Sequence, residues 1–222
     1  MAPTVLGIAG SARRGGNTEA LLDRALEGAA SAGATAEKVV LLDLRFSPCI
    51  CPTSEDCLPN GICSVNDEMQ QLYPRLLGCD LLFVASPVFF RGVTAQLKAM
   101  IDRCQALWVA KYRLGRPDSS GTPHRTARRK GLFVSVANTD DPKEFQGAIL
   151  VIRSLFATLN VRYEAGLLFD NIERLGDIQK RPEALKVAFD TGARLAQEEM
   201  GSSRDVRDNA GQAPSTSSGQ AP

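Results

Sequence analysis

Histidine is almost absent from this chain, which has only His124 among its 222 residues. Mechanisms that need two or more histidine ligands are therefore excluded. His124 lies in "SSGTPHRTARRK", a loop-like setting where a histidine is more often solvated than catalytic. The net charge is also small, at +1, so no overall field favours nucleic acid or a membrane surface. We expect neither as a partner.

Long hydrophobic runs are missing too. The longest, "LLFVASPVFF", is interrupted by Pro87 and is too short to cross a bilayer. The N-terminal stretch "MAPTVLGIAG" has no basic residue before its apolar run, which argues against a secretory signal. The sequence therefore predicts a cytoplasmic protein.

Apolar runs and helical patterns alternate along the chain, and 44% of the residues are hydrophobic, as in globular proteins. Strands are expected at 4–10, 36–44, 79–86, 131–137 and 162–170, and helices at 17–34, 66–78, 93–110, 142–159 and 182–200. This alternation predicts an α/β fold, a flavodoxin-like doubly wound parallel sheet of order 2-1-3-4-5 with helices on both faces. Ligands of such sheets bind beyond the carboxyl ends of the strands, here the loops 10–17, 86–92 and 138–142.

The composition changes near the C-terminus. Residues 202–222 are rich in serine, glycine, alanine and proline, and "GQAP" occurs twice among them. Such a segment cannot bury enough surface to offset the entropy of ordering. We expect one domain over 1–201, with a cysteine-rich insertion at 47–66 and a basic loop at 111–130, followed by a disordered tail after a helix that ends at Gly201.

The stretch "GIAGSARRGGNT" (7–18) joins the first strand to the first helix. Free N–H groups and the helix dipole make a helix N-terminus an anion site, and glycines allow close approach of the backbone. The candidate ligands are Ser11, Arg13, Gly16, Asn17 and Thr18. The stretch matches neither GxxxxGK[ST] nor GxGxxG, so it favours one terminal phosphate over a pyrophosphate. The alternative is a polar turn with solvated arginines.

Three segments, in order, carry a resemblance to a known family. The stretch "GIAGSARRGGNTEALLDRALEGA" resembles the FMN-phosphate loop of flavodoxin-like NAD(P)H-dependent FMN reductases and iron–sulfur flavoproteins. The segment "SPCICPTSEDCLPNGICSVNDEM" (47–69) resembles their cysteine-bearing segment, and "ASPVFFRGVTAQLKAMIDR" (85–103) resembles the part that lines the flavin ring. The similarity extends from about residue 4 to about residue 200.

The resemblance implies one noncovalently bound FMN whose ring rests on residues 86–90. The ring-binding residues would be Ser86, Pro87, Val88, Phe89 and Phe90. Backbone N–H groups of this loop would reach the polar edge of the ring, and the two phenylalanines would offer flat apolar surface, unless they belong to the core. No catalytic side chain is expected, because the flavin performs the chemistry. Electrons would come from NADH, NADPH or another carrier and pass to a small-molecule or protein acceptor. The protein would be a homo-oligomer.

Four cysteines lie close together in sequence, at Cys49, Cys51, Cys57 and Cys63. Their C-x-C-x5-C-x5-C spacing departs from the compact C-x2-C-x2-C of the iron–sulfur flavoproteins. Four thiolates still suffice for a [4Fe–4S] cluster or a zinc site with four cysteine ligands. Since the segment follows the second strand, we expect a cluster close to the flavin, acting as a one-electron relay. The alternative is a degenerate site with free thiols. Cys79 and Cys104 are expected to be buried core thiols.

The basic loop 111–130 could meet the 2′-phosphate of a nicotinamide nucleotide or an acidic redox partner, although a solvated loop is the more common explanation. The sequence therefore favours an FMN-dependent oxidoreductase with an iron–sulfur cluster. The alternatives are an electron carrier without enzymatic activity and a flavodoxin-like domain with structural zinc.

Overall fold

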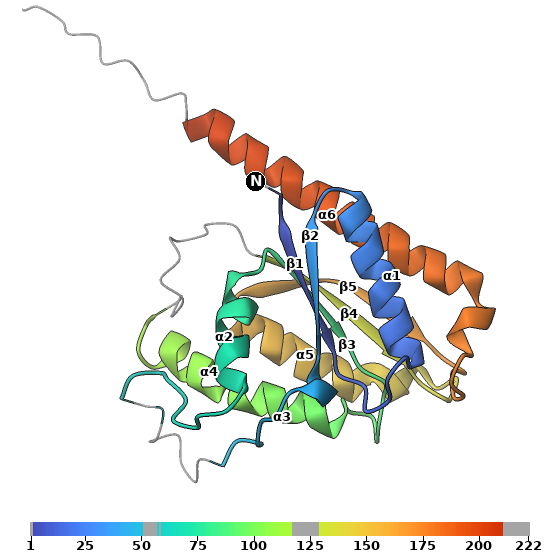
Figure 1. Ribbon diagram of the computed structural model, residues 1–222, viewed down its shortest axis with the longest axis horizontal. Helices are drawn as coiled ribbons and strands as arrows, with labels where there is room; N and C mark the ends of the chain where they lie inside the picture. The colour runs from blue at the N-terminus through green and yellow to red at the C-terminus, as the bar shows by residue number, and fades with distance from the viewer. Residues whose placement is uncertain (1, 51–56, 58, 117–128, 211–222) are drawn as a thin grey trace, which may run out of the picture.

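The computed structural model describes residues 2–50, 57, 59–116 and 129–210, and of residues 202–210 the backbone alone. Five strands form one parallel sheet of order β2-β1-β3-β4-β5 (Figure 1). They are β1 (Thr4–Ala9), β2 (Thr35–Val40), β3 (Leu81–Ala85), β4 (Arg129–Val136) and β5 (Val161–Phe169). The flavodoxin-like doubly wound fold is therefore confirmed.

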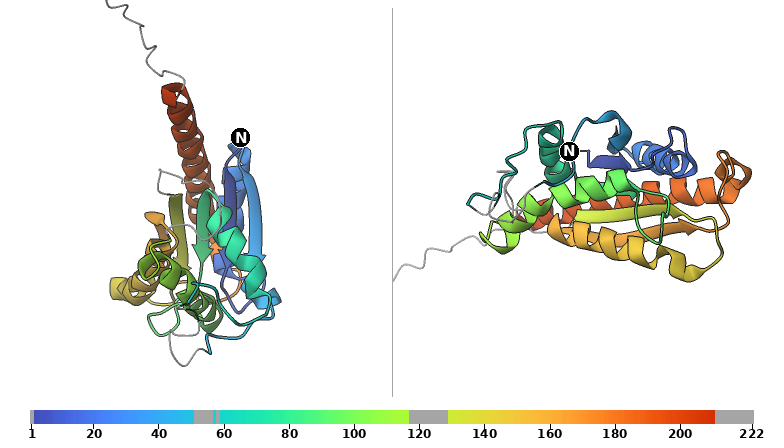
Figure 2. Two further views of the ribbon diagram at one scale, coloured as in Figure 1. Left: turned by 90° about the vertical axis from the view of Figure 1, so that its left-hand side faces the viewer. Right: turned by 90° about the horizontal axis from the view of Figure 1, so that it is seen from below.

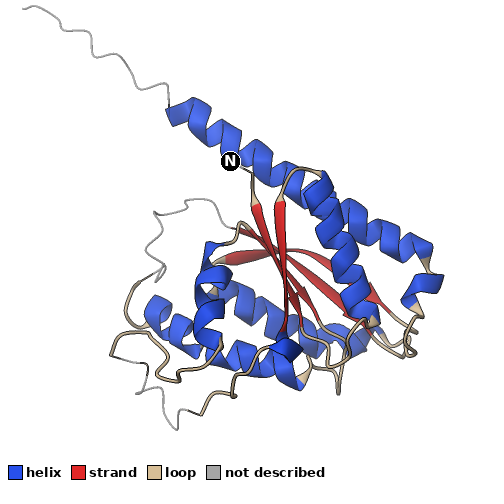
Figure 3. Cartoon of the chain, viewed as in Figure 1, coloured by secondary structure: helices blue, strands red, loops and turns tan. Residues whose placement is uncertain are grey.

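Helices cover both faces of the sheet (Figures 2 and 3). On one face lie α1 (Asn17–Ser31) and α6 (Pro182–Ala210), and on the other α2 (Met69–Gly78), α3 (Ala95–Arg103), α4 (Gln105–Tyr112) and α5 (Gln146–Thr158). Short 3₁₀ turns occur at η1 (Leu41–Asp43), η3 (Pro142–Phe145) and η4 (Ile178–Lys180). No helix in the described part of the chain has the length and apolar character to cross a membrane.

The single helix expected at 93–110 is instead two helices, α3 and α4. The backbone leaves the regular helical conformation at Cys104, where φ is −71° and ψ is 2°. The carbonyl oxygen of Arg103 accepts a hydrogen bond of 2.8 Å from the hydroxyl of Tyr73. The carbonyl oxygen of Arg103 therefore has a hydrogen-bond partner on α2 at the point where α3 ends.

The expected end of the last helix at Gly201 is also wrong, because the backbone of α6 continues to Ala210. Residues 202–210 contain neither glycine nor proline. Gly201 alone costs a helix about 1 kcal/mol relative to alanine and does not end it. The rest of the expected tail, 211–222, lies outside the described residues.

Two glycines allow α1 and α6 to pack closely. An ideal Cβ on Gly28 would overlap the carbonyl oxygen of Phe189, and one on Gly192 would overlap that of Ala25. We expect Gly192→Ala to lower the free energy of unfolding by about 1–3 kcal/mol, because backbone cannot move aside as a side chain can. Denaturant titration measures the change. Gly201→Ala is the matched control, since a Cβ there meets nothing within 4 Å. Equal stability of the two variants would contradict close helix packing.

Candidate cofactor site

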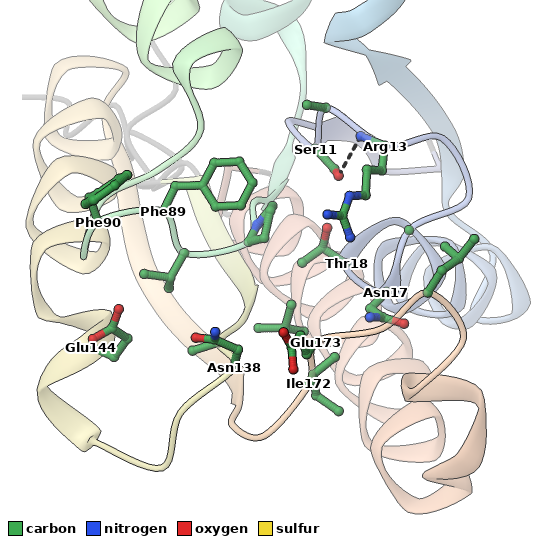
Figure 4. A pocket seen from close by; sticks show the side chains of 17 residues that line it. Ser11, Arg13, Asn17, Thr18, Phe89, Phe90, Asn138, Glu144, Ile172 and Glu173 are labelled. Carbon is green, nitrogen blue, oxygen red and sulfur yellow. Dashed lines mark hydrogen bonds between the residues drawn. The ribbon is translucent and has the colours of Figure 1, made fainter.

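A cavity of about 460 Å³ opens at the carboxyl edge of the sheet (Figure 4). Its walls come from the chain that follows β1, β3, β4 and β5. They comprise Ser11, Ala12, Arg13, Gly16, Asn17, Thr18, Pro87, Val88, Phe89, Phe90, Val136, Ala137, Asn138, Glu144, Ile172, Glu173 and Leu175. Every expected cofactor residue except Ser86 is on this wall. Sequence reasoning missed the loop after β5, although that strand ends at the same edge of the sheet.

The N-terminus of α1 forms one end of the cavity. Gly16 is the N-cap, and no side chain caps the helix. The N–H groups of its first turn have no partner within the helix, so they are available to an anion. Arg13 lies on the same wall, with its backbone N–H donating to Ser11 Oγ at 3.1 Å. This end of the cavity fits a phosphate group.

Glu19, on the first turn of α1, holds this loop from behind. Its carboxylate accepts a hydrogen bond of 2.8 Å from the Gly15 N–H and one of 2.9 Å from Lys38 Nζ. Lys38 also pairs with Asp23, at 2.7 Å. Burial opposes ionisation of Glu19, but Lys38 and the Gly15 N–H outweigh it, so the pKa of Glu19 is lowered. The buried negative charge of Glu19 is thus balanced by Lys38 within the protein, independently of a bound phosphate.

We expect Glu19→Gln to lower the free energy of unfolding by about 1–2 kcal/mol at neutral pH, through loss of the charged pairing with Lys38. Because the folded-state pKa of Glu19 is lowered, this contribution is present above its unfolded pKa of 4.5 and disappears as the pH falls through the folded value. The difference from wild type should therefore shrink below about pH 4. Glu27→Gln, at an exposed position of the same helix, is the control. If the stability difference between Glu19→Gln and wild type persisted below about pH 4, the charged pairing of Glu19 with Lys38 would be contradicted.

The two arginines of the loop have different surroundings. Arg14 is half-exposed and forms an ion pair with Asp43 of η1, and it is not part of the cavity wall. Only Arg13 therefore brings its cation to the cavity from this loop.

Asn17 has a structural role that the sequence did not reveal. Its amide Nδ2 donates to the carbonyl oxygen of Arg174 at 2.9 Å, and its Oδ1 accepts from the Ile178 N–H at 3.3 Å. Asn17 thus joins the start of α1 to the loop after β5, which supplies Ile172 and Glu173 to the wall.

The loop after β3 differs from the expectation. The N–H groups of Ser86 and Val88 donate to the carbonyl oxygens of Val134 and Val136, and that of Phe89 donates to Gly92. The prediction that the backbone N–H groups of this loop reach the ring's polar edge is therefore wrong for these three residues, because they extend the pairing of β3 with β4 or close a turn.

Ser86 is fully buried and does not line the cavity. Its Oγ accepts a hydrogen bond of 3.1 Å from the Thr94 N–H, and its carbonyl oxygen accepts one of 2.7 Å from Ser135. The hydroxyl of Thr94 in turn donates to the carbonyl oxygen of Gly10. Ser86 and Thr94 therefore brace the two loops against each other behind the cavity.

Phe90 and Arg91 form the tip of this loop. Both have positive φ, 50° and 61°, between the paired residues Phe89 and Gly92. Such backbone costs about 1–3 kcal/mol per residue without glycine, and it is common at functional sites. Phe89 is 50% exposed and Phe90 fully exposed, so the alternative that they are core residues is wrong. Arg91 anchors the tip through ion pairs to Asp141 and Glu144.

None of the cysteines that the structure describes lines the cavity. Cys57 and Cys63 are buried among the side chains beneath α2, α3 and α4, and Cys49 is half-buried. In the described ranges, no three cysteine, histidine or carboxylate side chains come together as metal ligands would. Cys51 lies outside those ranges. The residues as placed therefore do not form the expected cluster site. Cys79 and Cys104 are confirmed as buried thiols.

The basic stretch is not entirely a solvated loop. Arg129 and Lys130 belong to β4 and are buried, and Lys130 pairs with Glu198 at 3.0 Å. They lie at the amino end of β4, whereas the cavity lies at the carboxyl ends of the strands. Residues 117–128, with His124, are outside the described ranges.

The family model for NADPH-dependent FMN reductases matches residues 3–140. The chain belongs to this family of oxidoreductases. It is similar to an iron–sulfur flavoprotein of Archaeoglobus fulgidus, 31% identical over 194 residues, which is 86% of this chain and 78% of that one. An iron–sulfur flavoprotein of Methanocaldococcus jannaschii is 37% identical over 105 residues, 47% of this chain and about half, 53%, of the relative's length.

Among solved structures, an NAD(P)H:quinone oxidoreductase from Methanothermobacter marburgensis matches with a TM-score of 0.63 and 18% identity. The match covers 88% of this chain and all of the other. At this identity the likeness supports the fold alone.

Proposed function

We propose that this protein is an FMN-dependent oxidoreductase that takes electrons from NADH or NADPH and passes them to a small-molecule or protein acceptor. One observation carries the proposal. The uncapped first turn of α1 and the cation of Arg13 lie at one end of a cavity whose wall, toward the other end, carries the exposed aromatic rings of Phe89 and Phe90 (Figure 4). A ligand with a terminal phosphate and a flat ring system matches both ends.

In this proposal the phosphate binds at Ser11, Arg13, Gly16, Asn17 and Thr18, and the ring rests on Pro87, Val88, Phe89 and Phe90. Bound FMN would supply the hydride and electron transfer. The side-chain amide of Asn138 lies on the wall and is the proposed partner for the polar edge of the ring, in place of the loop N–H groups that are already used. The chain itself orients the ring and excludes water.

The test begins with the cofactor that copurifies. Heat-released supernatant should contain FMN and no FAD, because among the described lining residues a free helix N-terminus and an arginine come together at one wall of the cavity, which provides for one terminal phosphate. The holoprotein should oxidise NADH or NADPH when a quinone is added as acceptor. FAD in the supernatant, or a protein without flavin, would contradict the proposal. Bound FMN without nicotinamide oxidation would favour the electron carrier.

A [4Fe–4S] cluster at Cys49, Cys51, Cys57 and Cys63 is the finer part of the proposal. It is supported by the four thiols and by the names of the relatives, while no three of the described metal-ligating side chains come together. Anaerobic iron and sulfide analysis decides the matter. About four of each per chain would support a cluster. One zinc would favour a structural site, and no metal would leave a flavin-only enzyme.

The assembly and location of the protein also belong to the proposal. We propose a cytoplasmic homo-oligomer, on the basis of the family resemblance. Light scattering of the purified holoprotein tests the assembly, and a monomer at micromolar concentration would contradict it.

A further inference from the structure

The guanidinium of Arg103 lies at the base of the cysteine-bearing segment. Its side chain is 0% exposed. Nη1 donates to the Ser47 carbonyl oxygen at 2.9 Å and to Asp67 at 2.7 Å. Nη2 donates to the same carboxylate at 3.0 Å and to the Val65 carbonyl oxygen at 3.3 Å. One side chain thus ties the chain before Cys49 to the chain after Cys63.

Asp67 completes this closure. Its carboxylate accepts hydrogen bonds of 3.1 Å from the N–H groups of Ser47 and Met69. The pKa of Asp67 is lowered, with the hydrogen bond from Arg103 as the main cause. The chain at Ser47 and the chain at Val65–Asp67 are therefore joined by one ion pair, which we name the Arg103–Asp67 clasp.

The second half of the segment rests on helices next to the clasp. Gly61, at φ +68°, approaches α4 so closely that a Cβ there would lie 2.6 Å from that of Ala110. The Gly61 N–H donates to the Cys57 carbonyl oxygen at 2.7 Å. Gln70 Nε2 donates to the Cys63 carbonyl oxygen at 3.0 Å. The carbonyl oxygens of Cys57 and Cys63 are thus each held by a hydrogen bond, one from Gly61 and one from Gln70 of α2.

One donor of the clasp has no partner. Arg103 Nε is a buried side-chain nitrogen without a hydrogen bond in the described structure. Cys63 lies two residues before Val65, whose carbonyl oxygen accepts a hydrogen bond of 3.3 Å from Arg103 Nη2. The buried thiol of Cys63 is therefore close in the chain to the side chain of Arg103 that fixes the end of the segment.

We propose that Arg103 is the positioning residue of the cysteine-bearing segment: it closes both ends of the segment and keeps the sulfur of Cys63 in one buried place, independently of the FMN cavity. The independence follows from the placement, since neither residue of the clasp, nor Cys63, belongs to the cavity wall.

The test measures how fast individual thiols of the purified, full-length holoprotein react with N-ethylmaleimide, by mass spectrometry of peptides. The double variant Arg103→Met/Asp67→Leu replaces the buried ion pair by apolar groups of similar size, an exchange that many proteins tolerate. It removes the bonds to Ser47 and Val65. We expect the labelling rate of Cys63 to rise at least tenfold, while that of Cys79, a core thiol that reports global opening, stays unchanged.

Arg103→Lys keeps the charge beside Asp67 but cannot bridge both carbonyl oxygens. In Arg103→Lys the labelling rate of Cys63 should rise a few-fold, to a value between those of wild type and the double variant. If the double variant does not fold, the Arg103→Lys result alone tests the proposal. The dissociation constant for FMN should change less than twofold in both variants. Unchanged labelling of Cys63, an equal rise at Cys79, or loss of FMN would each overturn the proposal. If the proposed function fails, wild type itself will not bind FMN, whereas failure of this proposal appears in the labelling rates of Cys63. The two failures are therefore distinguishable.

Discussion

Replacement of Arg13 by alanine should raise the dissociation constant for FMN by about 10- to 100-fold. Hydrogen bonds to charged groups are worth about 1.5–3 kcal/mol, and each 1.4 kcal/mol is tenfold in affinity. Arg13 is the arginine that this loop places on the cavity wall, beside the uncapped first turn of α1. Quenching of flavin fluorescence on titration with apoprotein gives the constant directly.

Arg14→Ala is the matched control, because Arg14 is next in sequence but pairs with Asp43 away from the cavity wall. It should change FMN affinity less than twofold. Riboflavin, which has no phosphate, should bind wild type and Arg13→Ala equally well. If riboflavin binding fell as much as FMN binding, Arg13 would act on the loop as a whole and the assignment of the phosphate end would fail.

The end of the cavity proposed for the phosphate could be located from the sequence because its determinants are local. A buried strand, a glycine-containing loop and a helix start follow one another within residues 4–18, and the parallel order of the sheet brings that loop to the ligand-binding edge. The alternation of strands and helices likewise predicted the strand order. These features depend on composition and spacing over short stretches.

The structure of the end proposed for the flavin ring depends on pairing between distant segments. The N–H groups of Ser86 and Val88 donate to carbonyl oxygens of β4. The register of β4 against β3 cannot be predicted from any short stretch of sequence. Phe90 and Arg91 have left-handed backbone conformations although neither is glycine or asparagine, so their residue types did not predict these conformations. The bridge from Asn17 to Arg174 spans 157 positions. Sequence reasoning could name the loop but could not tell which of its groups remained free.

The cysteine-bearing segment shows the same limit. Spacing indicated four thiols for one metal, but the folded positions of Cys57 and Cys63 follow from what the segment packs against: α4 through Gly61, and the Arg103–Asp67 clasp at its base. Arg103 sits within an ordinary helical pattern, so nothing in its sequence neighbourhood distinguished a buried arginine from a solvated one.

Arg129 gives the sharpest contrast between sequence and structure. In "RTARRK" it looks like one cation among several in a loop. In the fold it is buried at the start of β4, where Nη1 donates to the carbonyl oxygens of Leu76, Leu77 and Cys79 at 2.7, 3.0 and 3.1 Å. Nη2 donates to that of Leu159, at the end of α5. One cation thus satisfies the carboxyl ends of two helices, α2 and α5.

We therefore expect Arg129→Leu to lower the free energy of unfolding by about 3–5 kcal/mol, because buried carbonyl oxygens lose their donor. The Tm should fall by roughly 6–20 °C, at about 2–4 °C per kcal/mol for a chain of this size. The ratio of kcat/KM for NADH to that for NADPH should stay as in wild type, since Arg129 lies at the edge of the sheet opposite the cavity. Calorimetry and steady-state kinetics below the Tm measure the two effects separately.

Arg113→Leu is the control for Arg129→Leu. Arg113 comes from the same basic stretch but is exposed, with its guanidinium 5.7 Å from the centre of the Trp108 ring. Its loss should move the Tm by no more than about 2 °C, as for most surface positions. If Arg129→Leu instead kept its Tm and lost activity with NADPH alone, Arg129 would bind the nucleotide 2′-phosphate. The carbonyl oxygens around its guanidinium predict the opposite, because donors already committed to two helix ends are not available to a ligand.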